Sequence, residues 1–209
     1  MSRAGVTVSA DGTVTGNTYD KYGSSNPVVR RLMAGFQAAL EELFEQADPR
    51  SLLDVGCGEG VLVERLARRL GSRRVVGVDL REESIQAGWA QHRAPNLEYR
   101  TMHGGELPFA TDEFDLVSAI EVLEHVPDAQ RTLDEMARCA QRHLLVSVPR
   151  EPLWRMLNMA RGAYVAQLGN TPGHLNHWSK RSFTTLLQAR GEIVQVRSPF
   201  PWTMLLVRL

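Results

Sequence analysis

Two carboxylates and one imidazole fall within five consecutive positions, at Glu121, Glu124 and His125. Pro127 disfavours helix at the preceding residue, so this segment is predicted to form one isolated turn. Residues three and four positions apart on a turn face the same way, which would bring the three side chains together. Such a group can bind a divalent ion, or His125 can act as a general base beside Glu121 without a metal. A surface ion pair between Glu121 and His125 is the remaining interpretation.

A second segment, residues 170–179, is punctuated by Pro172 and Gly173 and carries His174 and His177. Of the six histidines in the chain, three fall in these two segments. A flexible loop of this kind can bring a further ligand to the turn from across a cleft. The two segments together therefore predict a metal site, to which His174 or His177 supplies the further ligand.

The elements that must position these side chains follow an alternation of short apolar runs and amphipathic stretches. Strands are predicted at residues 51–55, 74–79, 97–101, 114–120 and 144–148, and helices at 27–48, 60–70, 82–93, 128–139 and 180–189. Two further runs, 192–197 and 202–207, are close enough to form a terminal hairpin. The alternation predicts a doubly wound α/β fold, in which a parallel sheet carries helices on both faces.

The turn at Glu121 directly follows the 114–120 strand. In open α/β sheets, ligands bind at the carboxyl ends of the strands, so this is the edge where a substrate is expected. Residues 150–180 follow the 144–148 strand at the same edge and are interpreted as a substrate-facing insertion. Apolar residues at the spacing found in the stretch 153–164 are also typical of a protein core, which is the alternative.

A glycine-rich turn follows the first strand, with Gly56, Gly58 and Gly60 at alternate positions. Glycine lets the backbone turn sharply and approach a ligand, and the next helix presents free N–H groups at its start. A dinucleotide fingerprint would need its third glycine at position 61, which is a valine. The second strand ends at Asp79, where a doubly wound sheet places the carboxylate that binds ribose hydroxyls. A bare turn with a helix-capping aspartate is the alternative.

These segments, with residues 107–109 (LPF) and 114–117 (FDLV), resemble motif I, the acid after it and motif IV of class I S-adenosylmethionine (SAM)-dependent methyltransferases. The resemblance covers roughly residues 30–150. It implies a seven-stranded, Rossmann-like sheet whose last strand is antiparallel, with SAM as the cofactor. It also implies that the glycine turn packs against the methionine moiety and that Asp79 binds the ribose. The implied cofactor-binding residues are Asp54, Gly56, Cys57, Gly58, Gly60, Asp79 and Leu80.

His103 stands where many of these relatives carry an aspartate that contacts the adenine amino group. Adenine is then expected to be held by backbone groups near His103 and Gly104, or by the His103 side chain. In relatives the N-terminal segment often folds over the SAM pocket. Residues 1–26 are therefore interpreted as a lid with Tyr22 as a cofactor-binding residue, and a partly ordered tail is the alternative.

The Glu-x-x-Glu-His pattern, followed later by a histidine before a tryptophan, is similar to the metal site of small-RNA terminal 2′-O-methyltransferases. A similar turn occurs in ubiquinone-type O-methyltransferases. The resemblance implies that Mg²⁺ or another divalent ion is held by Glu121, Glu124, His125 and His174 or His177. Both families methylate one oxygen of a vicinal pair, and chelation of that pair lowers the pKa of the attacking hydroxyl. The predicted function is SAM-dependent O-methylation of a quinol, catechol or natural-product hydroxyl.

Composition supports a small-molecule substrate, because the 24 basic and 24 acidic residues balance to a net charge of +0 and create no field for polyanions. RNA 2′-O-methylation and a non-catalytic SAM-binding protein are the alternative functions. The two cysteines, the polar N-terminus and the lack of a long apolar run predict a cytoplasmic protein without a membrane span. No linker divides the chain, so residues 1–209 are predicted to form one methyltransferase domain.

Overall fold

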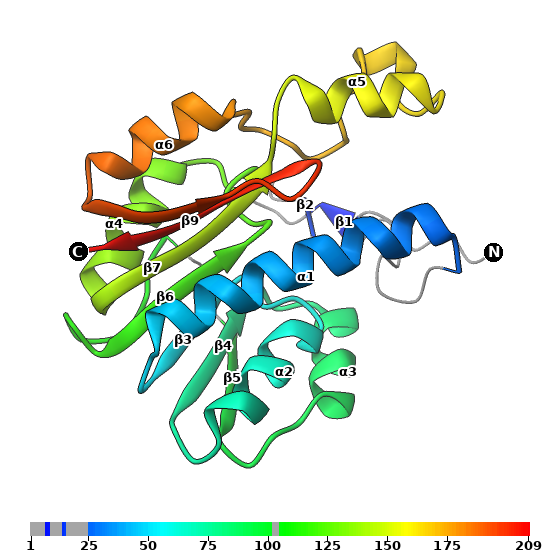
Figure 1. Cartoon of the computed structure of the whole chain (residues 1–209). Coiled ribbons are helices and arrows are strands. Elements are labelled where there is room, and N and C mark those ends of the chain that lie inside the picture. The colour runs from blue at the N-terminus through cyan, green and yellow to red at the C-terminus, as the bar shows by residue number, and fades with distance from the viewer. Residues whose placement is uncertain (1–6, 9–13, 16–24, 102–104) are drawn as a thin grey trace.

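The computed structural model describes residues 7–8, 14–15, 25–101 and 105–209. Its centre is a seven-stranded sheet in the order β5-β4-β3-β6-β7-β9-β8 (Figure 1). Strand β9 runs antiparallel to both of its neighbours, and the other neighbouring pairs are parallel. The predicted Rossmann-like sheet with an antiparallel last strand is therefore confirmed.

The strands of this sheet are β3 (Leu52–Val55), β4 (Val75–Asp79), β5 (Leu97–Thr101), β6 (Phe114–Ile120), β7 (Ala140–Pro149), β8 (Glu192–Arg197) and β9 (Trp202–Arg208). Strands β8 and β9 form the predicted terminal hairpin. A separate two-stranded ribbon pairs β1 (Thr7–Val8) with β2 (Val14–Thr15).

Helices cover both faces of the sheet, as predicted (Figure 1). On one face lie α1 (Pro27–Ala47) and α2 (Val61–Leu70). Trp89 of α3 (Glu83–Gln91) packs against the same core. On the other face lie α4 (Ala129–Cys139) and α6 (Lys180–Gln188). Successive strand residues point to opposite faces, so Leu52 faces the α1 layer and Leu53 faces the α4 layer.

The strand order reverses between β3 and β6, because the chain builds outward from β3 to β5 and then crosses back to β6. A doubly wound sheet opens a crevice at such a reversal, at the carboxyl ends of the two strands. The segment after β3 is the glycine turn, and the segment after β6 carries Glu121 and Glu124. The topology therefore places both predicted functional segments at one crevice.

Several elements differ from the sequence prediction, including strands β1 and β2, which lie in the predicted entry segment. Strand β7 begins at Ala140 instead of residue 144, because Ala140 both caps α4 and starts the strand. Residues 141 and 142 are exposed and polar, so they gave no apolar signal. The 150–180 segment contains a helix that was not predicted, α5 (Leu153–Ala160), and a short 3₁₀ turn, η1 (Val165–Gln167). Among the described residues, no helix has the length and apolar character needed to cross a membrane.

Candidate functional site

The glycine turn between β3 and α2 depends on a backbone conformation that glycine adopts at little cost. Gly56, Gly58 and Gly60 have φ angles of +74°, +55° and +96°. A Cβ atom at Gly56 would overlap the Val122 side chain, and one at Gly60 would overlap the Tyr99 hydroxyl. The glycine turn therefore lies directly against the segment that follows β6.

Asp79 ends β4 at the same edge, and its carboxylate already organises the glycine turn. Oδ2 accepts the Gly58 N–H at 2.5 Å, and Oδ1 accepts the Leu80 N–H at 2.7 Å. Trp89 Nε1 donates to the Gly58 carbonyl at 2.8 Å, which ties α3 to the turn. Burial raises the pKa of Asp79, and the two backbone donors oppose that rise. A carboxylate has about four lone-pair sites, so acceptor capacity is left for the hydroxyls of a ribose.

Asp54 and Cys57 lie beneath the turn, where their side chains are buried. Asp54 Oδ1 accepts the Ser118 hydroxyl of β6 at 2.6 Å. Burial raises the pKa of Asp54 to about 7, the Ser118 hydrogen bond lowers it, and the negative charge of Asp79 raises it. Burial also raises the pKa of the Cys57 thiol, so Cys57 is not a reactive nucleophile.

The adenosine side of the predicted cofactor site adjoins β5. Asp79 and Thr101 are paired in register at the ends of β4 and β5, so the chain leaves β5 beside the predicted ribose-binding carboxylate. The predicted adenine contacts, His103 and Gly104, lie outside the described residues, as does the predicted lid residue Tyr22.

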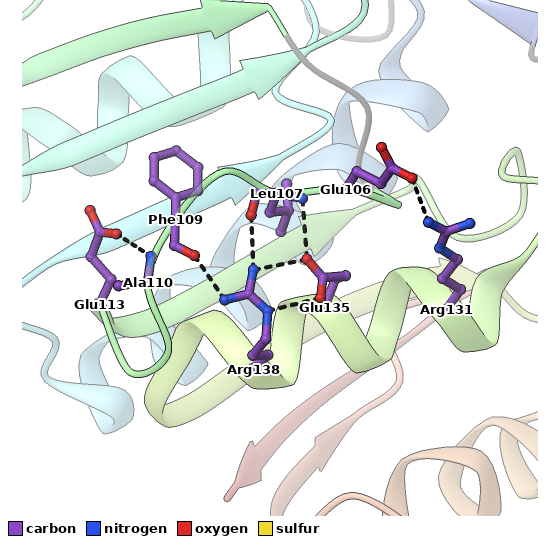
Figure 2. Close-up of polar contacts among 8 residues, drawn as sticks. All are labelled: Glu106, Leu107, Phe109, Ala110, Glu113, Arg131, Glu135 and Arg138. Carbon is purple, nitrogen blue, oxygen red and sulfur yellow. Dashed lines mark hydrogen bonds and ion pairs between the residues drawn. The ribbon is translucent and has the colours of Figure 1, made fainter.

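The LPF segment is held against α4 by one arginine–glutamate pair, as Figure 2 shows. Arg138 donates to the carbonyls of Leu107 and Phe109, each at 2.8 Å. Glu135 accepts the Leu107 N–H at 3.2 Å and forms an ion pair with Arg138 at 2.8 Å. Their mutual hydrogen bond raises the pKa of Arg138 and lowers that of Glu135, so both stay charged. We call this pair the Arg138 clamp, because it satisfies three backbone groups of the segment that follows β5.

The turn after β6 differs from the predicted one. Glu121 has a left-handed φ of +61°, and its N–H donates back to the Ser147 carbonyl of β7 at 3.2 Å. The turn itself begins at Val122, whose carbonyl accepts the His125 N–H at 2.9 Å. Glu121 Oε1 accepts the Ser147 hydroxyl at 2.9 Å. The expectation that Glu121 shares one helical turn with Glu124 and His125 is therefore wrong, because the backbone at Glu121 is left-handed and the turn starts only at Val122.

The 170–177 loop is fastened to this turn by hydrogen bonds. The Glu124 carbonyl accepts the N–H groups of Leu175 and Asn176, at 2.7 and 3.1 Å. The Asn176 side-chain amide also donates to the carbonyls of Leu123 and Val126, at 3.0 and 2.7 Å. One asparagine thus joins two segments that lie 53 residues apart in the sequence.

Glu124, His125 and His174 meet where the two segments join. One ligand atom from each lies within 4.8 Å of the others. The side chains of Glu124 and His174 are buried, with 1% and 8% of their surface exposed. The imidazole rings of His125 and His174 meet edge to face, with centroids 4.9 Å apart. A carboxylate with two imidazoles is a donor set that suits Zn²⁺, Mn²⁺ or Fe²⁺. We call these three residues the acid–histidine group.

The imidazole of His125 is oriented by the neighbouring loop. Its Nδ1 lies 3.0 Å from the Gly173 carbonyl oxygen. Because a carbonyl can only accept, Nδ1 carries a proton in this contact, and the neutral imidazole then has its lone pair on Nε2, which lies 4.0 Å from Glu124 Oε1. Metal–ligand bonds of ~2.1 Å require ligand atoms no more than ~4.2 Å apart. The Glu124–His125 pair meets that limit, and the ligand atoms of all three residues lie within 4.8 Å of one another.

Two predicted ligands are not members of this group. Glu121 is directed toward Ser147. His177 is exposed, and its Nε2 donates to Asn170 Oδ1 at 2.7 Å. Of the two loop histidines, His174 is the one that the structure brings to the turn.

Helix α5 supports the group from the side of the 150–180 segment. Trp154 Nε1 donates to Thr171 Oγ1 at 2.9 Å, and its ring stacks on His174 with a centroid separation of 6.1 Å. The buried Asn158 amide donates to the Gly169 carbonyl at 2.8 Å. The inner face of α5 therefore holds the loop that carries His174.

Four polar side chains in these networks were not recognised in the sequence, namely Ser118, Ser147, Asn176 and Arg138. Ser118 and Ser147 do leave a signal, because a hydroxyl inside an otherwise apolar strand needs a hydrogen-bond partner. Asn176 and Arg138 leave none, because their partners are backbone groups that only the folded chain brings to them.

Comparison with known proteins places the chain in a family. The profile of the family described as "Methyltransferase domain" matches residues 28–195. The ubiquinone biosynthesis O-methyltransferase of Alkalilimnicola ehrlichii is 29% identical over 158 residues, which is 68% of this chain and 63% of that protein. Methyltransferase GfsG of Streptomyces halstedii is 32% identical over 134 residues, 59% of this chain and 47% of that protein. The chain thus spans less than two thirds of the length of these relatives.

Solved structures share the fold at low sequence identity. Magnesium protoporphyrin IX methyltransferase (ChlM) from Synechocystis with bound SAH has a TM-score of 0.64 and 20% identity, with 89% of each chain covered. The S-adenosylmethionine-dependent methyltransferase from Mesorhizobium loti has a TM-score of 0.63 and 18% identity, with 84% of this chain and 98% of that chain covered.

Proposed function

The chain belongs to the methyltransferase domain family, and we propose that it methylates a hydroxyl of a small molecule with SAM as the donor. The proposed acceptors carry two adjacent oxygens, as a quinol, a catechol or a comparable natural product does. One observation carries this proposal. The turn that contributes Glu124 and His125 to the acid–histidine group also contains Val122, which abuts Gly56 of the glycine turn. A base or metal site therefore adjoins the predicted binding site of the methyl donor.

The donor half needs little chemistry from the protein. SAM is already an activated methyl donor, so the protein must align the acceptor oxygen with the methyl group and remove one proton. The glycine turn allows close approach of the methionine moiety, and the start of α2 offers backbone N–H groups. In this proposal the Asp79 carboxylate accepts hydrogen bonds from the ribose hydroxyls through the lone pairs that the Gly58 and Leu80 N–H groups leave open.

The acceptor half supplies the proton chemistry. The His125 Nε2 lone pair can accept the proton of the acceptor hydroxyl, because Gly173 holds the Nδ1 proton on the other side of the ring. A divalent ion bound by Glu124, His125 and His174 would supply a second route, since chelation lowers the pKa of a hydroxyl. In either role the side chains are oriented before the acceptor arrives, by Gly173 and by the buried position of Glu124.

The relatives support O-methylation at a coarse level, because the ubiquinone biosynthesis enzyme of A. ehrlichii is an O-methyltransferase. The net charge of +0 supports a small acceptor over a nucleic acid.

Matched acceptors test the proposed function directly. The purified chain is incubated with SAM and either a catechol-type diol, its mono-methyl ether or a phenol with one hydroxyl. We expect release of demethylated SAM with the diol, at a rate at least about tenfold above the other two, because only the diol can chelate an ion through two oxygens. Equal rates for the diol and the single phenol would contradict the role of adjacent oxygens.

A chelator separates the two roles of the acid–histidine group. If a metal is required, the chelator abolishes turnover while calorimetry shows unchanged SAM binding, and added Mn²⁺ or Zn²⁺ restores the rate. Turnover that resists the chelator assigns the chemistry to His125 as a metal-free base. Methylation of an RNA oligonucleotide in place of every small acceptor would overturn the proposal.

A further inference from the structure

Large exposed apolar side chains gather at one end of the molecule. Among the described residues, six of the eight exposed large hydrophobic side chains lie on the 150–180 segment or on the β8–β9 turn beside it. They are Met156, Met159, Val165, Leu168, Leu175 and Phe200. The β8–β9 turn lies beside the start of that segment, because the Pro201 carbonyl accepts the Arg150 N–H at 3.0 Å. Scattered apolar residues need no explanation, but such a concentration marks an interaction surface.

Four of the six belong to the α5–η1 segment (residues 153–168), which projects beyond the end of β7 (Figure 1). Its inner face is committed to the fold through Trp154 and Asn158. Met156 and Met159 occupy another face of the same helix, and Met156 is 62% exposed. The segment is therefore an amphipathic element whose outer apolar side chains, Met156, Met159, Val165 and Leu168, are each at least 45% exposed.

The charged side chains of the stretch that contains this face have one sign. No aspartate or glutamate occurs between Glu151 and Glu192, and that stretch contains five basic residues: Arg155, Arg161, Lys180, Arg181 and Arg190. Arg190 is paired with Asp134, whereas Arg161, Lys180 and Arg181 are exposed. The net charge of +0 for the whole chain therefore conceals a basic region on this insertion.

We propose that the α5–η1 segment binds the surface of an anionic lipid bilayer. Met156, Met159, Val165 and Leu168 enter the boundary between headgroups and acyl chains, and the exposed Arg161 lies at the lipid phosphates. Short amphipathic helices with basic flanks bind membrane surfaces in this way, through buried apolar area and attraction to anionic lipid together. The surface lies next to the acid–histidine group, because Trp154 of the same helix stacks on His174.

The types of the exposed side chains favour lipid over RNA. Proteins bind single-stranded nucleic acid by stacking bases on exposed aromatic rings beside basic residues. Here Trp154 is turned inward against His174 and Trp202, and Tyr164 is half-buried. The outward side chains of the α5–η1 segment are methionine, valine and leucine, which provide apolar area for acyl chains and offer no ring for a base. Phe200, which is also exposed, lies on the β8–β9 turn outside this segment.

Vesicle co-sedimentation of the full chain tests the proposal. Vesicles of equal parts phosphatidylglycerol and phosphatidylcholine are compared with vesicles of phosphatidylcholine alone, at low salt. We expect binding to the anionic vesicles and at least about fivefold weaker binding to the neutral ones, because each basic residue near an anionic surface contributes measurably. The double variant Met156→Glu/Leu168→Glu should weaken anionic binding at least about tenfold, and Arg161→Glu about fivefold or more.

Leu209→Glu is the matched control for the apolar change. Leu209 is also an exposed hydrophobic residue. Its N–H donates to the Arg142 carbonyl near the amino end of β7, whereas the α5–η1 segment follows the carboxyl end of β7. This variant should bind vesicles like the wild type. All variants should keep wild-type SAM affinity, measured without vesicles, which separates loss of the surface from loss of the fold.

Several outcomes would overturn the proposal. Absence of binding to the anionic vesicles would do so, and so would equal binding to both compositions. Equal losses of anionic-vesicle binding in the double variant and in Leu209→Glu would show that the α5–η1 segment is not the binding surface. Binding of a short single-stranded RNA, lost in Arg161→Glu while vesicles stay unbound, would assign the surface to nucleic acid. Self-association that the double variant abolishes, again without vesicle binding, would assign it to a second copy of the chain.

Discussion

The donor half and the acceptor half of the candidate site are built in different ways. In the donor half, the hydrogen bond from Gly58 to Asp79 joins consecutive strand–helix units and spans 21 residues. In the acceptor half, the hydrogen bond from His125 to Gly173 spans 48 residues and joins two loops outside the sheet. The donor half therefore follows from the sheet itself, whereas the acceptor half depends on how the 150–180 segment folds back. Loops of this kind can change substrate without disturbing the cofactor site beneath them.

The largest expected effect comes from the acceptor half. Glu124→Ala should lower turnover by about a hundredfold or more, because it removes the one carboxylate of the acid–histidine group. SAM affinity should stay within about twofold of the wild type, since Glu124 belongs to the acceptor half only. Steady-state kinetics with the diol acceptor and calorimetry with SAM measure the two effects.

His177→Ala is the matched control for Glu124→Ala and for His174→Ala. His177 lies on the same loop as His174 but is exposed and bonded to Asn170. We expect His174→Ala to resemble Glu124→Ala and His177→Ala to resemble the wild type. If His177→Ala loses turnover and His174→Ala does not, the acid–histidine group is not the functional one.

The next effect lies in the donor half. Asp79→Ala should weaken SAM binding by about tenfold to a hundredfold, because a hydrogen bond to a charged group contributes about 1.5–3 kcal/mol. The same variant removes the acceptor for the Gly58 N–H, so its thermal stability is measured in parallel. Unchanged SAM affinity in a folded Asp79→Ala protein would show that the ribose is bound elsewhere.

A pH series sharpens the role of buried charge in the donor half. Burial raises the pKa of Asp54 to about 7, above the ordinary value of 3.8, so the folded chain keeps a proton that the unfolded chain releases. Stability contributed by this group is complete below pH ~4 and is lost as the pH rises toward ~7. Between pH 5 and 7 the wild type should lose about 1–2 kcal/mol of unfolding free energy relative to Asp54→Asn, within a ceiling of about 1.36 kcal/mol per pH unit.

Urea unfolding of both proteins without SAM, at each pH, measures this difference. Asparagine retains a side-chain oxygen for the Ser118 hydroxyl, which makes the comparison close to isosteric. A stability difference that does not change with pH would show that Asp54 is already ionised at pH 5.

The smallest expected effect concerns the Arg138 clamp. Arg138→Ala releases the carbonyls of Leu107 and Phe109, so the segment beside the adenosine side of the site loses its anchor on α4. We expect the KM for SAM to rise about threefold, with kcat nearly unchanged and a melting temperature lower by several degrees. Arg138→Lys should restore part of the KM, because it can still donate to one carbonyl.

Arg131→Ala is the control on the same helix. Arg131 pairs with Glu106 of the same segment, but both side chains are exposed and the pair contacts no backbone group of the LPF segment. Exposed pairs contribute little, so both KM and melting temperature should stay close to the wild type. If the two arginine variants behave alike, the clamp has no special role in positioning.

Most of the sheet could be predicted from hydrophobic periodicity. The bounds of β5, β6 and β8 coincide with the predicted ranges, and both β6 and β8 are bordered by polar or glycine residues. The start of β7 and the whole of α5 could not be predicted. Residues 141 and 142 near the start of β7 are polar and exposed. The apolar pattern of α5 is equally consistent with a helix buried in the core.

By itself, the sequence determined the donor half of the site: the Gly56, Gly58 and Gly60 turn, and Asp79 at the end of the next strand. These features depend on glycine backbone freedom and on the position of each residue at the end of a strand, which are local properties. Only the tertiary structure decided the acceptor half. A left-handed backbone at Glu121 turns that carboxylate toward Ser147, and Asn176 fastens the loop so that His174, and not His177, reaches Glu124. Contacts between segments about fifty residues apart depend on how loops pack, and no local propensity encodes that packing.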